Sequence, residues 1–239
     1  AGLHQKAVCV ASELTSPALV SKFYDPEYEA THDNPDKDPY MAFEKDFMRF
    51  MLSDGAGAVL VQDYPEGACP LKIEWVDMTS YANELPTCMF MASELQEDGR
   101  LKSWKEFSPN EIKERAVLVG KQDIRQLKKH IIKYWVDHIE TILAKHHVKA
   151  EEIDYVIPHV SSMFFYEKLN DEIAARNIAL TKEKWFTNLT SVGNIGSAAI
   201  YVALEELIRT KEIKRGQKIL LLVPESGRFS YGTVLLTVQ

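Results

Sequence analysis

The sequence is poor in cysteine, with only Cys9, Cys69 and Cys88 among its 239 residues. An odd number at irregular spacing supports neither a disulfide framework nor a cysteine metal site, so we expect a reducing cytoplasm. Basic residues are also in deficit, with 28 Lys and Arg against 35 Asp and Glu, which argues against a nucleic-acid-binding face. No apolar run approaches the roughly 20 residues of a membrane span.

The remaining composition is that of an ordinary soluble protein. Hydrophobic residues make up 46% and charged residues 26% of the chain, which is long enough to bury a substantial core. The first ten residues, AGLHQKAVCV, lack the basic region of a signal peptide and enter a strand almost at once. We therefore expect the chain to begin in the middle of a larger protein.

Short apolar runs alternate with amphipathic stretches along the chain. Residues 16–40 are rich in Pro, Asp, Asn and Tyr and predict an irregular segment, and residues 81–98, interrupted by Pro86, fit no single element. Apolar runs predict strands, and residues at helical spacing predict helices. The strands are expected at 6–11, 58–61, 71–78, 154–158, 218–223 and 231–238, and the helices at 42–52, 120–146, 161–176 and 196–210. This order indicates an α/β layered sheet covered on both faces.

His159 follows the apolar run of residues 154–158 directly. A buried strand there would deliver the imidazole to the carboxyl edge of the sheet, where open α/β sheets place their sites. A histidine at a strand end is more often a capping or surface residue, and the neighbouring Pro158, Ser161 and Ser162 raise the functional interpretation only modestly.

Asn194 lies in a run of small residues, GNIGSAA, before an expected helix. It is suited to cap that helix, which is a common structural role. Its amide is equally suited to bind a carbonyl oxygen beside His159, because two donors that converge on one oxygen stabilise enolate or tetrahedral charge.

Two glycine-containing segments need separate interpretations. The first, SDGAGA at 53–58, precedes a strand instead of opening a helix, so we interpret it as close backbone packing and not as a phosphate loop. The second, PESGRFSYG at 224–232, joins the last two strands. It is either a β-hairpin turn or a turn that aims a backbone N–H into a site.

None of the cysteines is a convincing nucleophile, because a reactive thiol needs a cationic neighbour or a helix N-terminus. Cys9 lies between valines in a strand and is expected to be an inert core residue, Cys69 adjoins Pro70 in a turn, and Cys88 is placed to line a pocket. The pair His146-His147 ends the long helix and is expected to contribute charge and capping instead of binding metal.

Taken together, the segments SDGAGAVLV, IDYVIPH, VGNIGSAA and GRFSYG resemble, in this order, four motifs of the β-ketoacyl-ACP synthase III branch of the thiolase-like condensing enzymes. The stretches HVSSMFF, EKWFTNL and PESGRFS further resemble the subgroup that acts in dialkylresorcinol and aryl-lipid pathways. The resemblance implies a layered αβαβα thiolase-like fold. Residues 1–62 would end the N-terminal half, and residues 63–239 would form the C-terminal half.

The resemblance also implies a mechanism. A nucleophilic Cys, expected just before Ala1 in the missing N-terminal part, would take an acyl group from a CoA or acyl carrier protein thioester. His159 and Asn194 would bind the carbonyl of a malonyl-type thioester. The backbone N–H of Gly227 or Arg228 would join the amide of the nucleophilic Cys in a second oxyanion hole. The loop after His159 would contact pantetheine and carrier protein, and Ser162 and Phe164 stand there in place of the family's Asn and basic residue. These two residues and the pocket residue Cys88 are the expected substrate-binding positions. The family implies a homodimer, and neither a cofactor nor a metal ion.

Two alternatives remain open from the sequence. The chain is either part of a decarboxylative condensing enzyme or a non-catalytic subunit of the same fold that pairs with an active ketosynthase. A soluble α/β binding domain without thioester chemistry is a third interpretation, which His159 and Asn194 in their sequence context disfavour.

Overall fold

A mixed four-stranded sheet forms the centre of the molecule. The computed structural model describes residues 4–20, 22, 48 and 51–239. The strands lie in the order β3-β10-β9-β8, in which β8 and β9 are parallel and the other neighbours are antiparallel. Their bounds are β3 Leu71–Ser80, β8 Tyr155–Pro158, β9 Lys218–Glu225 and β10 Ser230–Val238.

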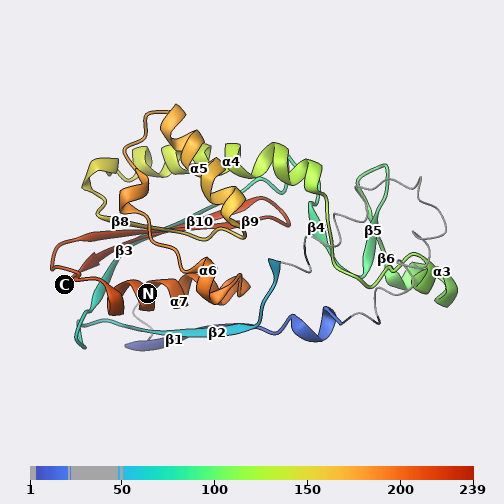
Figure 1. Cartoon of the computed structure of the whole chain (residues 1–239), viewed down its shortest axis with the longest axis horizontal. Coiled ribbons are helices and arrows are strands. Elements are labelled where there is room, and N and C mark those ends of the chain that lie inside the picture. Colours follow the sequence, from blue (N-terminus) through green and yellow to red (C-terminus); the bar gives the residue numbers. More distant parts are fainter. Residues whose placement is uncertain (1–3, 21, 23–47, 49–50) are drawn as a thin grey trace.

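Helices cover both faces of this sheet (Figure 1). On one face lie α4 (Ile124–Lys145) and α5 (Met163–Ala175), and on the other lie α6 (Leu189–Val192) and α7 (Ala199–Thr210). Successive residues of β9 face opposite sides, as the pleat requires. Its Leu220 and Leu222 pack with α4 and α5, whereas its Ile219 and Leu221 pack with α7. The predicted α/β sheet covered on both faces is therefore confirmed.

Helix α4 shows how local sequence sets this arrangement. Asp123 caps its N-terminus, accepting a hydrogen bond from the Gln126 N–H at 2.9 Å. Its buried face includes His138, whose ring nitrogens lie 3.1 Å from the Thr79 hydroxyl of β3 and 3.0 Å from the Thr233 hydroxyl of β10. The helix ends at Lys145 and His146 is its C-cap residue, as predicted, while the His146 side chain contacts Asp77 at 2.7 Å.

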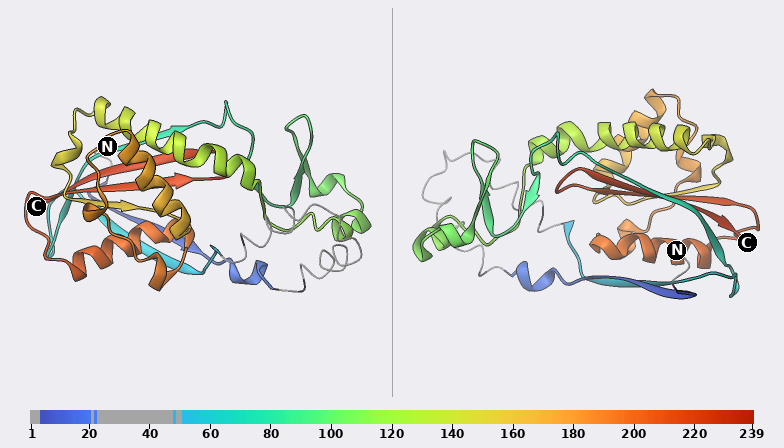
Figure 2. Two further views of the ribbon diagram at one scale, coloured as in Figure 1. Left: turned by 45° about the horizontal axis from the view of Figure 1, so that its top comes forward. Right: turned by 180° about the vertical axis from the view of Figure 1, so that it is seen from behind.

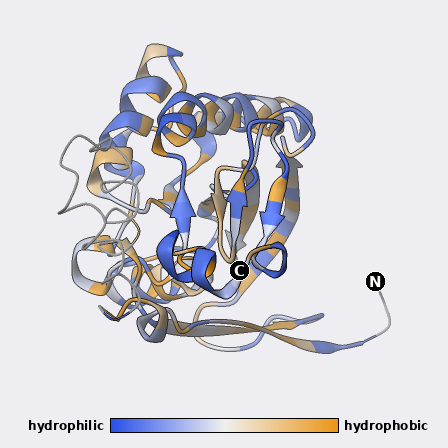
Figure 3. Ribbon diagram, turned by 90° about the vertical axis from the view of Figure 1, so that its right-hand side faces the viewer, coloured by the Kyte–Doolittle hydropathy of each residue, from blue (hydrophilic) through white to orange (hydrophobic). Residues whose placement is uncertain are grey.

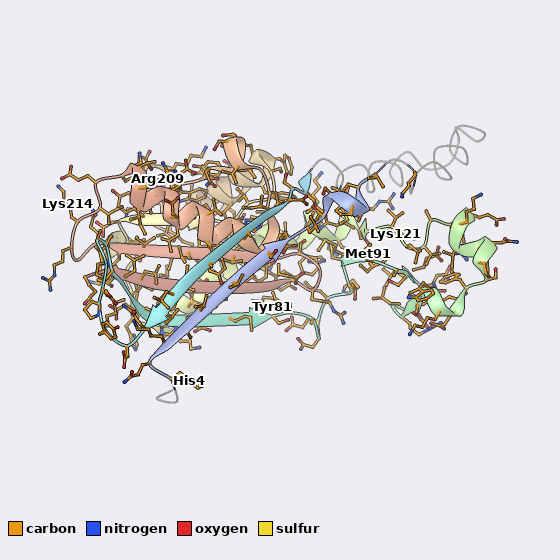
Figure 4. All side chains as sticks on the ribbon, turned by 90° about the horizontal axis from the view of Figure 1, so that it is seen from below. His4, Tyr81, Met91, Lys121, Arg209 and Lys214 are labelled. Carbon is orange, nitrogen blue, oxygen red and sulfur yellow. The ribbon has the colours of Figure 1, made fainter. Side chains whose placement is uncertain are left out.

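Two strands near the N-terminus, β1 (Lys6–Glu13) and β2 (Gly55–Gln62), form a separate antiparallel pair. We call this pair the hairpin, although a long segment of the chain connects its strands. It lies below α7 in Figure 1 and along the lower edge of the molecule in Figure 3, and Figure 4 shows it crossing in front of the body with His4 at its free end. Glycines bring it close to the helical layer. A Cβ atom on Gly57 would lie 2.8 Å from Tyr201 Cβ, and one on Gly55 would lie 2.6 Å from Ile195 Cβ. The expected close backbone packing of the SDGAGA segment is confirmed.

The burial expected for this hairpin is wrong in two respects. Cys9, expected in the core, is exposed, and the apolar run at 58–61, whose composition predicts a buried strand, alternates between exposed and half-buried residues. On the outer face, Val8, Val10 and Leu60 are exposed by 65%, 67% and 57%. The physical reason is that β1 and β2 pair only with each other within the described residues. Helix α7 packs on β2, and β1 meets the helical layer chiefly through η6 (Gly196–Ala198), so Cys9, on the face opposite Val8 and Val10, is exposed as well.

A lobe projects from the end of the layered body, visible in both views of Figure 2. It contains two small antiparallel pairs and a short helix that begins with a capping box between Ser108 and Glu111. Figure 4 labels Met91 and Lys121 at its base. Its elements are β4 (Met89–Phe90), β5 (Ser93–Leu95), β6 (Leu101–Ser103), β7 (Lys121–Gln122) and α3 (Pro109–Glu114).

Single 3-10 turns complete the described secondary structure: η1 (Ser16–Ala18), η3 (Trp104–Glu106), η4 (Ala150–Glu152), η5 (Lys182–Lys184) and η6 (Gly196–Ala198). The helix expected at 42–52 and the irregular segment expected at 16–40 lie largely outside the described residues. In the part of the chain that is described, no helix combines the length and apolar character needed to cross a membrane.

Candidate functional site

His159 lies directly after β8, at the carboxyl end of that strand. Its backbone N–H donates to the Leu222 carbonyl at 2.8 Å, which continues the parallel pairing of β8 with β9 by one residue. The side chain is half-buried, and this burial lowers the pKa of the imidazole below its ordinary value, so the ring is neutral at neutral pH. Neither ring nitrogen has a hydrogen-bond partner among the described residues.

Asn194 is buried, with 7% of its surface exposed, in the loop between α6 and η6. Its Oδ1 accepts a hydrogen bond from the Gly196 N–H at 3.2 Å. Because only the oxygen of the amide accepts this bond, the Nδ2 group is left as the free donor. Within the described chain Nδ2 has no partner, so the capping role and the donor role predicted for Asn194 are compatible.

His159 and the loop that carries Asn194 meet at one small hollow. His159 and Gly193, the residue before Asn194, both line a cavity of about 20 Å³ between β8 and α7. Thr187, Asn188 and Ala199 also line it. A strand end and a glycine-rich loop that are distant in sequence therefore meet at one place.

The loop that carries Asn194 is anchored from the start of β2. The Ser53 N–H donates to the Asn194 carbonyl at 2.9 Å. Gly193 has φ of +83°, and a Cβ atom there would lie 2.8 Å from Ser53 Oγ, so only glycine fits. Asp54 in turn accepts from the backbone N–H groups of Thr15 and Ser16 at 2.7 and 2.9 Å. Sequence reasoning did not find this anchor, although the SDG triplet was its signal.

The glycine turn between β9 and β10 is a hairpin, as one of its two interpretations held. Its backbone donors are engaged. The N–H groups of Gly227 and Arg228 both donate to the Glu225 carboxylate, the second at 2.9 Å. The Arg228 guanidinium donates to the Thr87 hydroxyl.

The other candidate contacts lie in different surroundings. The Ser162 hydroxyl, three residues after His159, is buried without a hydrogen-bond partner. Phe164, on the first turn of α5, is 53% exposed. Cys88 is fully buried in the core beside α4, and its thiol donates to the Asp123 carbonyl at 3.3 Å. Burial of this kind makes a thiol inert.

A second hollow lies between α4 and α5. It is a groove of about 530 Å³ that Phe164 lines together with four lysines: Lys128, Lys129, Lys133 and Lys168. Asp171 and Glu172 also reach it. No group of three or more His, Cys, Asp or Glu side chains in the described ranges is arranged to hold a metal ion.

Residues 143–238, which include His159 and Asn194, match the family model of the C-terminal domain of 3-oxoacyl-[acyl-carrier-protein] synthase III. The β-ketoacyl-[acyl-carrier-protein] synthase III of Clostridium acetobutylicum is 30% identical over 112 residues, 47% of this chain and 33% of that protein. The corresponding protein of Clostridium perfringens is 28% identical over 186 residues, 78% of this chain and 52% of that protein.

Solved structures share the fold. The 3-oxoacyl-[acyl-carrier-protein] synthase III of Aquifex aeolicus superposes with a TM-score of 0.60 at 22% identity, covering 98% of this chain and 58% of its own. A variant of OleA from Xanthomonas campestris gives a TM-score of 0.66 at 18% identity, covering 99% and 57%.

The fold is therefore the thiolase-like mixed α/β fold of these synthases, which confirms the predicted fold class. Residues 143–238 are similar to a synthase III C-terminal domain. The chain spans about a third to a half of the curated relatives cited here, and under two thirds of the solved ones. The division of the chain at residues 62 and 63 stays a prediction, as do the roles of the site residues.

Proposed function

We propose that this chain is part of a β-ketoacyl-ACP synthase III-like acyltransferase that performs decarboxylative condensation of acyl thioesters in fatty-acid or aryl-lipid biosynthesis. The observation that carries this proposal is that His159 and the loop of Asn194 meet at one hollow, which His159 and Gly193 line. His159 is neutral with free ring nitrogens, and Asn194 has a free, oriented Nδ2 group. The similarity of residues 143–238 to the synthase III C-terminal domain supports it.

The chemistry follows from two donors that converge on one carbonyl oxygen. When the bond between the α-carbon and the carboxylate of a malonyl thioester breaks, CO2 leaves and the electron pair moves onto the thioester oxygen as an enolate. Hydrogen bonds from His159 and Asn194 stabilise this developing charge, and donors of this kind each contribute about a hundred- to a thousandfold in rate. The enolate carbon then attacks an acyl-cysteine carbonyl, and the cysteine thiolate leaves.

The nucleophilic cysteine comes, in this proposal, from a polypeptide segment outside the 239 residues. Cys88 is sealed in the core, and Cys9 lies in β1 on the hairpin. The exposed outer face of Val8, Val10 and Leu60 is a surface on which such a segment packs. We refer to this chain with that segment as the active assembly, and we expect it to be a cytoplasmic homodimer that needs neither a cofactor nor a metal ion.

The substrates are proposed to be thioesters of coenzyme A or of acyl carrier protein. The lysine-lined groove between α4 and α5 supports a phosphate-bearing, acidic carrier. We expect Lys128→Glu/Lys129→Glu to raise the KM for a carrier-bound thioester, and Lys214→Glu, on the exposed turn before β9, to leave it unchanged. If the groove variant and the Lys214→Glu control have the same KM for the carrier-bound thioester, the groove does not bind the carrier.

A finer assignment to the dialkylresorcinol and aryl-lipid subgroup is also proposed. Phe164, which stands where the wider family has a basic residue, presents an exposed ring at the groove and supports an apolar substrate contact there. Ser162, with its unpartnered buried hydroxyl, supports a polar contact to the same substrate close to His159.

Two half-reactions of the active assembly test the function. His159→Ala and Asn194→Ala are each expected to slow malonyl-thioester decarboxylation by at least about a hundredfold, because each removes one donor to the enolate oxygen. Acyl transfer to the cysteine needs neither donor and should persist in both variants. Decarboxylation at the wild-type rate in His159→Ala would contradict the assignment.

Mass spectrometry of this chain alone with an acyl-CoA should show no stable adduct on Cys9, Cys69 or Cys88.

A second candidate is a non-catalytic subunit that pairs with an active ketosynthase. One observation favours it, namely that Glu225 occupies both backbone donors of the turn at Gly227 and Arg228. Because both N–H groups already donate to Glu225, neither is free to stabilise the oxyanion that forms when the acyl-cysteine carbonyl is attacked. A Ser or Gly in place of the nucleophile in the accompanying segment, with no decarboxylation by the assembly, would decide for this candidate.

A further inference from the structure

The carboxylate of Glu13, at the last residue of β1, lies against the loop that carries Asn194. Its Oε1 accepts from the Ser197 N–H at 3.0 Å and from the Ser197 hydroxyl at 2.6 Å. The two residues are 184 positions apart in sequence. This contact spans two layers of the fold and joins the hairpin to the start of the helix formed by η6 and α7.

The close approach is built into the backbone. Gly196 has φ of +56°, and a Cβ atom there would lie 2.6 Å from Glu13 Cγ, so a side chain at 196 would push the carboxylate away. The Ser197 N–H is one of the first donors of the helix, which have no partner within the helix itself. The Ser197 hydrogen bonds hold the pKa of Glu13 below its ordinary value, so the carboxylate is charged at neutral pH and favourably placed at a helix N-terminus.

From Ser197 the constraint reaches Asn194 in two short steps. Ser197 fixes the first turn that contains Gly196, and the Gly196 N–H is the group that orients the Asn194 amide through Oδ1. On the other side, Ser53 holds the Asn194 carbonyl, and Gly55, the register partner of Glu13, packs against Ile195. The end of the hairpin therefore holds the loop on both sides of Asn194.

We propose that Glu13 is a positioning residue for the Asn194 amide, acting through its two hydrogen bonds to Ser197. The proposal rests on the condensing function proposed above, in which Asn194 Nδ2 must meet a thioester oxygen. A displacement of about 1 Å in a catalytic group can lower a rate by about a hundredfold, so a remote carboxylate that fixes this loop has a measurable effect on the reaction. Glu13 itself touches no reacting atom.

The test compares Glu13→Ala with Glu13→Gln in the active assembly. Glu13→Ala is expected to lower kcat for malonyl-thioester decarboxylation by about ten- to a hundredfold, with acyl transfer to the cysteine within about twofold of wild type. Glu13→Gln keeps an oxygen that accepts from Ser197 and should restore most of the rate. Glu66→Gln, an exposed carboxylate near the other end of the hairpin, is the matched control and should change neither step.

Hydrogen exchange of this chain gives a readout that needs no activity. Glu13→Ala should accelerate exchange of the Ser197 amide by about tenfold or more, whereas Glu13→Gln should protect it nearly as well as wild type. If Glu13→Ala does not fold, Ser197→Ala, which loses only the hydroxyl donor, should show a smaller loss of decarboxylation with acyl transfer intact.

The outcomes separate the two proposals. A wild-type assembly that does not decarboxylate a malonyl thioester contradicts the proposed function, and the exchange result then decides the positioning role alone. Unchanged exchange and decarboxylation in Glu13→Ala would overturn the role of Glu13. An equal loss of both half-reactions would overturn it as well, because it would indicate general damage to the fold.

Discussion

Two strands of this molecule have similar sequences and opposite surroundings. β1 reads KAVCVASE and β9 reads KILLLVPE, each eight residues long from a lysine to a glutamate. In β9 the four residues from Ile219 to Leu222 are buried, whereas in β1 no residue is buried and Val8 and Val10 are about two thirds exposed. β9 lies between two strands and two helical layers, but β1 has one partner strand and meets the helical layer chiefly through η6. Burial of an apolar strand is therefore set by its neighbours, not by its own sequence.

The two regions also contribute differently to the site. The layered body presents His159 at the end of β8, and its long packed strands fix that position. The hairpin contributes no side chain to the hollow beside His159, but its Glu13 and the adjoining Ser53 hold the loop of Asn194. The body carries both candidate residues, and the hairpin constrains the loop of one of them.

The largest expected difference between the regions is in stability. Leu220→Ala, at a fully buried position of β9, should lower the free energy of unfolding by about 2–5 kcal/mol, because it removes packed volume and leaves a cavity. Val8→Ala, on the exposed face of β1, should change it by less than about 0.5 kcal/mol. Urea denaturation of this chain measures both. Equal losses would show that the hairpin is packed as tightly as the body.

The contact between hairpin and body depends on a glycine. Gly57→Ala would place a methyl group 2.8 Å from Tyr201 Cβ, so we expect a loss of about 1–3 kcal/mol and faster amide exchange in β2. Gly232→Ala in β10 is the matched control, because its nearest atom would be the Val223 carbonyl oxygen at 3.8 Å. If both substitutions behave alike, steric contact with α7 does not hold the hairpin in place.

The smallest effect concerns a charge cluster of the body. Lys145 and His146 lie 2.6 and 2.7 Å from the Asp77 carboxylate and lower its pKa to about 2. Because the folded pKa lies below the unfolded value, this stabilisation is present above about pH 4 and is lost as the pH falls toward 2. Asp77→Asn should therefore cost about 1–2 kcal/mol at pH 7 and progressively less as the pH falls through 2. A loss of stability in Asp77→Asn that does not change with pH would contradict the charge explanation.

Local patterns in the sequence predict the layered body well. Sequence patterns correctly predicted the long helix and the strands at 154–158, 218–223 and 231–238. The spacing of apolar residues and the length of each apolar run distinguish helices from strands, although α4 begins at Ile124 and not at residue 120. The positions of His159 and Asn194 were predicted for the same reason, since His159 follows a clearly patterned strand and Asn194 precedes a clearly patterned helix; their roles stay predictions.

The remaining features depend on contacts between residues far apart in the chain. Nothing near Glu13 in the sequence indicates that it binds Ser197, and nothing near Cys9 shows that its strand is exposed along most of its length. The occupation of Gly227 and Arg228 by Glu225 was also missed, although PESG places a carboxylate close to both donors. Side-chain interactions that close such turns need coordinates, because the same residues are compatible with a free N–H.

The central claim, that His159 and Asn194 hold one thioester oxygen, is tested most directly by a crystal structure of the active assembly with a non-hydrolysable malonyl-thioester analogue. The account predicts that the thioester carbonyl oxygen lies within hydrogen-bonding distance, about 3 Å, of both a His159 ring nitrogen and Asn194 Nδ2. A carbonyl bound away from both groups, or an Asn194 amide turned so that its oxygen faces the ligand, would contradict it.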